Sequence, residues 1–531
     1  MIAWILLHAL YAAVLTTLAY NVGRFALLRF LPEPPFATST ALGLGLIGEA
    51  LFLLAAAGQL TRWTVLGVLV IACATVRRLP KPSPLIVATL PAFVLALYPP
   101  TGYDATMYHL PFARLFAETG RLAFADTLRF PVFPQLSEVL FSGAMLIADD
   151  VTAQLTQWLA LAVTTAAIAE LAEKRALLAT ALWIGTPLAL YLGGNAYIDC
   201  TLAMFVTLAF AAYLQWRRTD AWIWAVLAGA FAGFAASTKY HGLYFLGVLV
   251  AAVMWRNRRA AAAFALAAAL LAAPWYARIW AATGNPLFPY FSSIFGRHEW
   301  QTKLDARMER TAGDPRTAAP TEDPVTATVL RAIADPLEIG MAPHSPLVLL
   351  LLPFAVLAAI REPRLRFPLG AAFVYALLVS PLDWRFMLAI VPLIAICIAA
   401  GLPRVRFAWA AALILAAPGL LWATLLIYKF GPIPASQETR DAFLAKRIPV
   451  YATLRALPGR PVVYLLHAEY AHYYCPARCL GENYGPYRYE KIEPLLRDPA
   501  RLAAVMRSFG VQVLVVDRQR DRQFRRDAVF Y

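Results

Sequence analysis

The stretch FAWAAALILAAPGLLWATLLI, residues 407–427, contains no charged side chain and a single hydroxyl group, that of Thr424. About 20 apolar residues in a helix are enough to cross the hydrocarbon core of a bilayer. Apolar runs recur along the whole chain, and they are continuous rather than alternating in polarity, as in membrane helices and unlike the strands of membrane barrels. The pattern therefore predicts an α-helical membrane protein.

The overall composition supports this prediction. The 531 residues are 60% hydrophobic and 15% charged, with a mean hydropathy of +0.60, whereas soluble domains are about one half apolar and one quarter charged. The net charge of +15 would favour nucleic-acid binding in a soluble protein. Here most basic residues flank apolar runs, as the positive-inside bias requires. We therefore expect membrane lipids around the protein and no nucleic-acid partner.

The apolar runs predict a polytopic protein with roughly 12–14 transmembrane helices. The candidate spans are 2–20, 38–60, 63–77, 84–98, 152–170, 178–193, 197–214, 221–237, 241–254, 260–278, 345–360, 367–380, 386–401 and 407–427. Segment 134–148 is ambiguous. We interpret it as an interfacial helix on the outer surface, because a crossing there would invert the later alternation of charged loops.

Basic residues cluster in every second loop, and this asymmetry identifies those loops as cytoplasmic. The basic clusters are Arg24 and Arg29; Arg77, Arg78 and Lys81; Lys174 and Arg175; Arg217 and Arg218; Arg256, Arg258 and Arg259; Arg361, Arg364 and Arg366; and Arg404 and Arg406. The complementary loops then face outward, and they are 102–111, 193–199, 237–242, 283–344, 380–386 and the tail after Lys429. We expect an inner or plasma membrane protein with both termini outside the cytoplasm.

The chain divides into four parts by composition: N-terminal membrane helices (1–98), a large outer loop (99–150), a membrane core with outer loop 283–344 (151–429), and a polar tail (430–531). In the tail, 461–467 and 511–517 are typical of buried strands. Residues 494–510 predict an amphipathic helix that ends at Gly510. Strand, helix and strand in this order predict a small extracytoplasmic α/β domain.

Two cysteines in the tail, Cys475 and Cys479, are four residues apart. Outside the cytoplasm such a pair can form a local disulfide. A zinc site is the alternative, with His467, Glu469 and His472 as further ligands. The sequence leaves both open.

Asp104 lies in the stretch GYDATMYHLP (102–111), just after an apolar run that ends at Pro100. A carboxylate near a membrane is costly and usually has a partner or a purpose. Asp104 can be a general base that takes a proton from an acceptor hydroxyl or amine. Alternatively it is an ordinary interfacial acid or a helix N-cap, since ATMYHLPFARLF is a typical helix start. The residue alone favours the second interpretation.

Other polar residues of the predicted outer loops also have two interpretations. Lys239 in STKYHG can hold a phosphate or simply extend toward the interface. Arg385 in SPLDWRF can do the same, or pair with Asp383. His109 can donate to a phosphate, act as a base, or be an interfacial histidine with satisfied hydrogen bonds. Asn285 can bind a polar substrate or stabilise a turn.

Metal and nucleotide motifs are missing from the sequence. It has no HExxH spacing, P-loop, Rossmann fingerprint or GxSxG. A metal that bridges Asp104, Asp126 and Glu138 has no support from ligand spacing. We expect no cofactor, although a divalent metal stays open.

Four motifs in a fixed order resemble one family. They are YDATMYHLP in the first large outer loop, STKYHGLYF, PWYARIWAATGNPLFPY, and DWRFMLAIVP before a late span. This order resembles the GT-C superfamily of membrane glycosyltransferases, and more narrowly its branch of protein O-mannosyltransferases and aminoarabinose transferases. The resemblance runs from about residue 99 to the end. The four N-terminal spans depart from the family, which usually has one span before this loop.

The resemblance implies a hexosyl or pentosyl transferase that uses a polyprenyl-phosphate donor and a lipid, glycan or protein acceptor. The implied site residues are Asp104 as catalytic base; Lys239, Arg385, His109 and Tyr240 for the donor phosphate; and Tyr108 and Asn285 for the acceptor or the donor sugar. Many family members have two adjacent acids in this loop, whereas Asp104 stands alone, which favours a metal-independent mechanism. One base without a second nucleophilic acid implies inversion.

Two other classes of protein remain. A transporter or flippase of lipid-linked glycans would have charges inside spans and paired broken helices, and no inverted repeat is evident in this sequence. A non-catalytic membrane scaffold whose tail binds a partner would not need Asp104.

Overall fold

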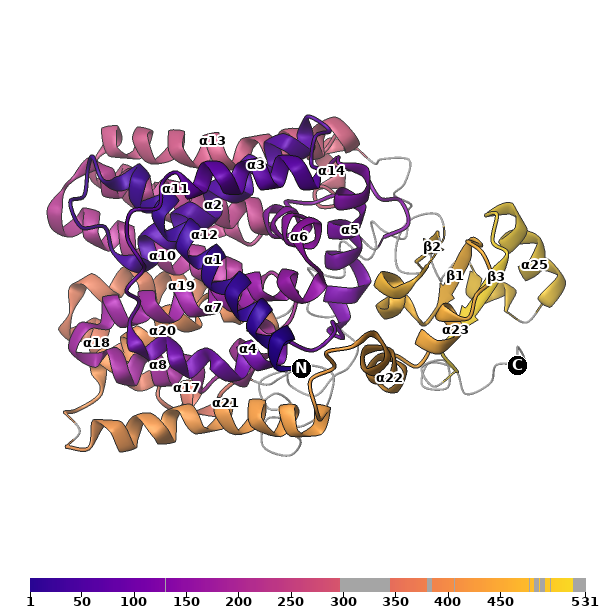
Figure 1. Cartoon of the computed structure of the whole chain (residues 1–531). Helices are drawn as coiled ribbons and strands as arrows, with labels where there is room; N and C mark the ends of the chain where they lie inside the picture. The colour runs from indigo at the N-terminus through magenta and orange to yellow at the C-terminus, as the bar shows by residue number, and fades with distance from the viewer. Residues whose placement is uncertain are drawn as a thin grey trace.

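The computed structural model describes residues 1–128, 130–296, 344–379, 384–404, 406–476, 478–481, 487, 492–496 and 498–518. In this part of the chain, a large helical domain is followed by a small α/β unit beyond one end of the helices (Figure 1). Most of the predicted outer loop 283–344, and Asp383, lie outside the described residues.

Up to Phe430, the regular elements of the described residues are all helices. The first group is α1 (Ile2–Leu27), α2 (Phe36–Ala56), α3 (Arg62–Cys73), η1 (Pro84–Thr89), α4 (Leu90–Ala96), η2 (Ala105–His109), α5 (Leu110–Thr119), α6 (Leu136–Ile147), α7 (Asp150–Ala172), η3 (Glu173–Arg175), α8 (Ala176–Ile184), α9 (Pro187–Gly193) and α10 (Asp199–Thr219). The second group is α11 (Trp222–Thr238), α12 (Gly242–Arg256), α13 (Arg258–Thr283), α14 (Ser292–Phe295), α17 (Pro346–Leu350), α18 (Leu352–Arg361), η4 (Pro363–Leu365), α19 (Arg366–Val379), η5 (Trp384–Ala389), α20 (Val391–Gly401) and α21 (Ala408–Phe430).

Each predicted span overlaps one or more of these helices, but prolines divide several of them. Pro187 begins α9 and separates it from α8, and Pro353 lies in the first turn of α18. Proline lacks an N–H group and therefore fits best in a first turn. Among the described helices, six are long and apolar enough to cross a membrane by length and composition, and other apolar helices have 10–17 residues. The many-helix membrane fold is confirmed, while the number of crossings stays a prediction.

The N-terminal helices are an integral part of this domain. A Cβ atom on Gly23 of α1 would lie 1.9 Å from the carbonyl oxygen of Ser39 in α2, and one on Gly43 would lie 1.8 Å from that of Ala19. Glycine thus lets the two backbones approach closely. Helix α2 also packs against α6 and α7, so the segment that departs from the family resemblance joins the same core.

Helix α6 corrects one expectation. Its 12 residues span roughly 18 Å at about 1.5 Å per residue, which is shorter than the ~30 Å hydrocarbon core, in agreement with a segment that does not cross. It does not lie on the surface, however. Residues 136–144 are buried, with α2, α5 and α7 packed around them, because apolar side chains such as Val139 and Phe141 occupy several sides of the helix.

Loops that were predicted to share one side of the membrane meet in the structure. The Asn21 side-chain amide donates to the Arg78 carbonyl over 2.8 Å, and Arg175 donates to the Pro403 carbonyl over 3.1 Å. These contacts join loops of the predicted cytoplasmic set. Pro403 precedes the N-terminal end of α21, whereas the α/β unit lies beyond the C-terminal end of this helix (Figure 1). The grouping of loops therefore agrees with the structure, and which group faces the cytoplasm stays a prediction.

The tail contains the predicted strands and helix. Its elements are α22 (Gln437–Arg447), α23 (Tyr451–Arg455), β1 (Val463–Leu466), η6 (Glu469–Tyr474), β2 (Cys479–Leu480), η8 (Glu493–Leu495), α25 (Pro499–Ser508) and β3 (Val513–Val516). The three strands form a parallel sheet in the order β2-β1-β3, with Val463 beside both Cys479 and Val513. Gly510, with a φ of 73°, follows α25, since glycine tolerates a left-handed conformation.

The tail packs on the outer loop of the helical domain. The Tyr474 hydroxyl donates to the Pro100 carbonyl over 2.6 Å, and the Tyr473 hydroxyl donates to the Asp150 carboxylate over 3.0 Å. Cys475, next to these tyrosines, forms a disulfide with Cys479. Of the two alternatives for these thiols, the structure therefore contains the disulfide. Through η6 the α/β unit rests directly against η2, which follows Asp104.

Candidate active site

Asp104 precedes a short π-helical turn. In η2 the Leu110 N–H donates to the Ala105 carbonyl, five residues earlier, and the next residue, Pro111, has no N–H to continue an α-helical pattern. π-turns of this kind often occur at functional sites. Asp104 itself has helical backbone angles and its side chain does not cap the helix. The interpretation of Asp104 as a helix N-cap is therefore wrong.

The Asp104 carboxylate is buried and accepts hydrogen bonds from two side chains. Arg385 Nη1 donates to Asp104 Oδ2 over 2.6 Å, and the Tyr108 hydroxyl donates to the same oxygen over 3.0 Å. Only 8% of Asp104 and 8% of Arg385 is exposed. A hydrogen bond between two charged groups of this length is strong, so the two segments, 281 residues apart in sequence, are held together here.

A second carboxylate, Asp199, extends the chain of charges. Lys239 Nζ lies 2.9 Å from Asp199 Oδ1, and Arg385 Nε lies 3.8 Å from Asp199 Oδ2. Asp199 is 2% exposed. The order Asp104–Arg385–Asp199–Lys239 alternates acid and base, which compensates the charges that burial removes from water. We call these four residues the charge chain.

The charge chain is assembled from the ends of separate helices. Asp104 precedes η2, Asp199 is the first residue of α10, Lys239 follows α11, and Arg385 lies in η5. Sequence reasoning missed Asp199. Its signal was an acid at the end of the polar loop 193–199, which was predicted to face the same side as Asp104.

Aromatic rings support the two cations. The ring centre of Phe386 is 4.3 Å from Lys239 Nζ and 5.2 Å from the Arg385 guanidinium carbon, and Tyr197 is 5.3 Å from the same carbon. Rings at such distances attract cations through their electron-rich faces. The cations are therefore fixed in place from two sides, by carboxylates and by aromatic rings.

Burial and nearby carboxylates shift the pKa values of Arg385 and Lys239 in opposite directions. Burial by itself lowers the pKa of Arg385, but the Asp104 and Asp199 carboxylates raise it well above its usual value. For Lys239 burial prevails and lowers the pKa, although Asp199 opposes this effect.

His109 has a different partner. Its Nδ1 atom lies 2.5 Å from Glu138 Oε1, and both side chains are almost completely buried. Asp126 lies 3.7 Å from Arg478 of the tail. The three acids that were considered for a bridging metal thus have separate partners, and within the described residues no group of three or more His, Cys, Asp or Glu side chains is arranged to hold a metal ion.

Tyr240 and Asn285 belong to a neighbouring turn. The Tyr240 hydroxyl donates to the Phe288 carbonyl over 2.5 Å. The Asn285 amide donates to the Tyr290 carbonyl over 2.7 Å, and its oxygen accepts from the Leu287 N–H over 2.9 Å. The turn interpretation accounts for the Asn285 side chain. The structure thus joins Asp104, Tyr108, Lys239 and Arg385, while the roles of all predicted site residues stay predictions.

Fold and site together define the class of protein: a polytopic helical membrane protein with a GT-C-like architecture and a small C-terminal α/β unit. The dolichyl-phosphate-mannose-protein mannosyltransferase family matches residues 152–290. A family described as SF2091/S2213 matches residues 439–530. Both matches are partial, and the first includes Asp199 and Lys239.

One solved structure and one sequence relative are also similar to this chain. The structure of ArnT from Cupriavidus metallidurans bound to undecaprenyl phosphate is similar with a TM-score of 0.50 and 15% identity, over 83% of this chain and 93% of ArnT. An uncharacterised protein of Shigella flexneri, SF2093/S2215, is 38% identical over 65 residues, which are 12% of this chain and 31% of that protein. The chain thus spans about a third of that relative. The mannosyltransferase match and the ArnT-like fold support a GT-C superfamily glycosyltransferase.

Proposed function

We propose that this protein transfers a hexosyl or pentosyl group from a polyprenyl-phosphate donor to an acceptor, with Asp104 as the general base. The observation that carries the proposal is the buried charge chain, in which the Asp104 carboxylate contacts Arg385 and a second cation, Lys239, lies beyond Asp199. Sugar transfer from a lipid phosphate needs these groups, because an acceptor must lose a proton while the leaving phosphate gains negative charge.

Arg385 and Lys239 are suited to bind the donor phosphate. A guanidinium offers two parallel N–H donors to a phosphate, and an ammonium adds a compact charge. Asp199 lies between the two cations and holds them at a fixed separation. Such preorganised charges stabilise a developing phosphate without reorganisation during the reaction. With both cations supplied by side chains, the mechanism needs no metal at the phosphate.

Donor binding and base strength are coupled through Arg385. Its guanidinium contacts the Asp104 carboxylate, and this contact weakens the carboxylate as a base. A donor phosphate competes for the same guanidinium and so makes Asp104 a better proton acceptor. Asp104 then deprotonates the acceptor as it attacks the anomeric carbon, the carbon–phosphate-oxygen bond breaks, and the sugar configuration inverts.

The relatives support the donor class but leave the acceptor open. The matched family is described by its use of dolichyl-phosphate-mannose, and ArnT was seen with undecaprenyl phosphate. The acceptor is a lipid, a glycan or a protein. The alternating basic loops support a position of the site and the 430–531 tail outside the cytoplasm of an inner or plasma membrane. A reporter fused after the tail that is active only outside the cytoplasm tests this orientation.

The decisive experiment measures sugar transfer or hydrolysis from a panel of polyprenyl-phosphate sugars by protein in nanodiscs. Asp104→Asn should lower turnover by about 10²–10⁴-fold, the usual contribution of a general base, with donor binding retained. Glu118→Gln, an exposed acid in the neighbouring helix α5, serves as the control and should keep wild-type turnover.

Other outcomes would redirect the assignment. Equal turnover in Asp104→Asn would remove this residue from the mechanism. Movement of intact lipid-linked glycan across vesicles without sugar release would favour a flippase. No binding or turnover with any donor would favour a scaffold.

A further inference from the structure

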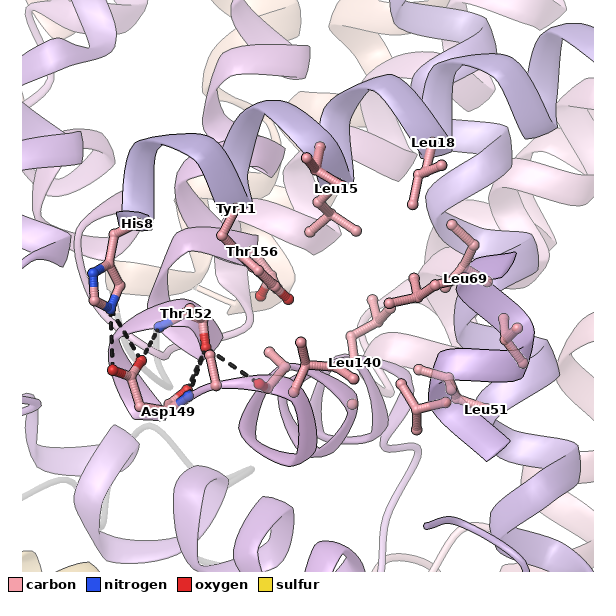
Figure 2. A pocket seen from close by; sticks show the side chains of 18 of the residues that line it. His8, Tyr11, Leu15, Leu18, Leu51, Leu69, Leu140, Asp149, Thr152 and Thr156 are labelled. Atoms are coloured by element: carbon pink, nitrogen blue, oxygen red, sulfur yellow. Dashed lines mark hydrogen bonds and ion pairs between the residues drawn. The ribbon is translucent and has the colours of Figure 1, made fainter. Parts of the chain in front are cut away.

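A largely apolar cavity of about 530 Å³ lies between the N-terminal helices and the outer loop (Figure 2). Its wall comes from α1, α2, α3, α6 and α7, with Leu15, Leu51, Leu69 and Leu140 among the lining side chains. Its size is within the range of pockets that hold small organic ligands, about 300–1,000 Å³. No member of the charge chain lines it, so this cavity is separate from the candidate active site.

The cavity reaches the outside of the helical domain. Leu7, Leu10 and Val14 of α1 line it, and they are also among the exposed apolar side chains, with 61%, 60% and 45% exposure. Helix α1 is a candidate membrane span. These residues therefore form a rim that the acyl chains of the bilayer can contact.

A second, polar cavity of about 430 Å³ adjoins the first, and Ala148 and Asp149 line both. Its wall includes Asp150 and the tail residues Gln437 and Arg440. Arg440 pairs with Asp150. An apolar cavity and a charged cavity thus lie side by side, an arrangement that suits an amphiphile.

The charges at the polar end favour one kind of head group. Asp149 is paired with His8 at 3.0 Å, but 40% of its side chain remains exposed (Figure 2). Asp149 and Arg440 thus present opposite charges at this end. An amine cation is attracted by the exposed part of Asp149, and a phosphate is attracted by Arg440, so the pair matches a head group that carries both charges.

We infer that these adjoining cavities are a binding site for an amine-bearing phospholipid, with its acyl chain between α1, α3 and α6 and its head group at Asp149 and Arg440. The lipid would connect the N-terminal helices to the tail, because Arg440 belongs to α22. The site is built partly from the spans that depart from the GT-C resemblance.

Lipid retention tests this inference directly. The full-length protein is reconstituted in nanodiscs with equal amounts of phosphatidylethanolamine and phosphatidylglycerol, and the lipids that stay bound after extraction are counted by native mass spectrometry. Wild type should retain phosphatidylethanolamine in preference by about fivefold, as for a partly exposed ion pair.

Matched variants separate the two ends of the site. Val68 lines the apolar cavity, whereas Val70 on the same helix does not line it and is 69% exposed. Val68→Trp should fill the cavity and abolish retention, and Val70→Trp should not. Asp149→Asn keeps an N-cap for α7, because asparagine caps helices as well as aspartate, and should abolish the preference between the two lipids.

Three results would overturn the inference. They are equal retention by Val68→Trp and Val70→Trp, preference for the amine-free lipid by wild type, and displacement of the retained lipid by polyprenyl phosphate. Asp104→Asn tests whether lipid binding is independent of the proposed sugar transfer. This variant should lose sugar transfer and retain lipid at the wild-type level.

Discussion

Two ion pairs at the candidate site of the helical domain are buried, whereas one ion pair within the α/β tail is exposed. In the helical domain, the Asp104–Arg385 and Asp199–Lys239 pairs are buried and join distant parts of the chain. In the tail, Arg455 lies 3.7 Å from Asp441, close in sequence and with side-chain exposures of 55% and 35%. An exposed pair contributes about 0–1 kcal/mol, whereas breaking a buried pair destabilises by about 3–5 kcal/mol. Buried ion pairs therefore indicate a functional site better than exposed ion pairs do.

Among the substitutions that compare these two regions, the largest effect is expected at Arg385. Arg385→Gln removes one cation from the donor phosphate and leaves Asp104 beside a neutral side chain. Transfer should fall by about 10²–10³-fold, with a lower unfolding temperature, measured by sugar release and by thermal unfolding in nanodiscs.

The tail offers the matched control for this substitution. Arg455→Gln should change neither turnover nor unfolding temperature. Comparable losses in both variants would erase the difference between the two regions.

A smaller effect is expected at Asp199, which positions Lys239 and Arg385 rather than contacting the sugar. Asp199→Asn should raise KM for the donor by about tenfold, the size of one lost ion pair of roughly 1.4 kcal/mol, with a smaller change in kcat. A structural role alone would instead lower the amount of folded enzyme and leave KM unchanged. Asp199→Glu should recover part of the donor affinity.

The tail should respond in stability rather than in chemistry. The Cys475–Cys479 disulfide closes a short loop, for which loop entropy predicts about 2 kcal/mol of stabilisation. The double substitution Cys475→Ser, Cys479→Ser should therefore lower the unfolding temperature of the tail, followed by the fluorescence of its tyrosines. Cys73→Ser, an exposed thiol outside the disulfide, is the control. An unfolding temperature unchanged by the double substitution would contradict the prediction.

The smallest effect is an acid sensitivity of the tail at His472. Burial, helped by Arg114, lowers the pKa of His472 to about 4, compared with about 6.5 in an unfolded chain. Between these two pKa values, His472 binds a proton in the unfolded state but not in the folded state. The free energy of unfolding is therefore unaffected by this group above about pH 6.5 and falls as the pH drops toward 4. The full difference between these two pKa values corresponds to about 3 kcal/mol. Because the His472 side chain is partly exposed, we expect a smaller loss of about 1–2 kcal/mol over this interval.

His472→Gln checks this assignment, because glutamine does not titrate. The variant should show a flatter pH profile of the unfolding temperature between these two pH values. A profile as steep as that of wild type would show that another group carries the acid sensitivity.

Much of the architecture could be predicted from the sequence. The apolar runs located the membrane helices, and the pattern of short apolar strands and one amphipathic helix located β1, α25 and β3. The breaks at Pro187 and Pro353 were not predicted, although proline is visible in the sequence, because a proline in a membrane run can also be tolerated inside a helix. The buried position of α6 depended on contacts with helices far away in the chain.

The site divides in the same way. By itself the sequence determined a membrane protein with Asp104, Lys239 and Arg385 on one predicted face, because hydrophobic length and charge asymmetry are local properties that need no tertiary contacts. Only the tertiary structure decided that Asp199 lies between Lys239 and Arg385 and that Glu138 pairs with His109. It also decided that an apolar and a polar cavity adjoin beside α1. These features depend on which helix ends meet in space, and that is set by packing between elements that are separate in the sequence.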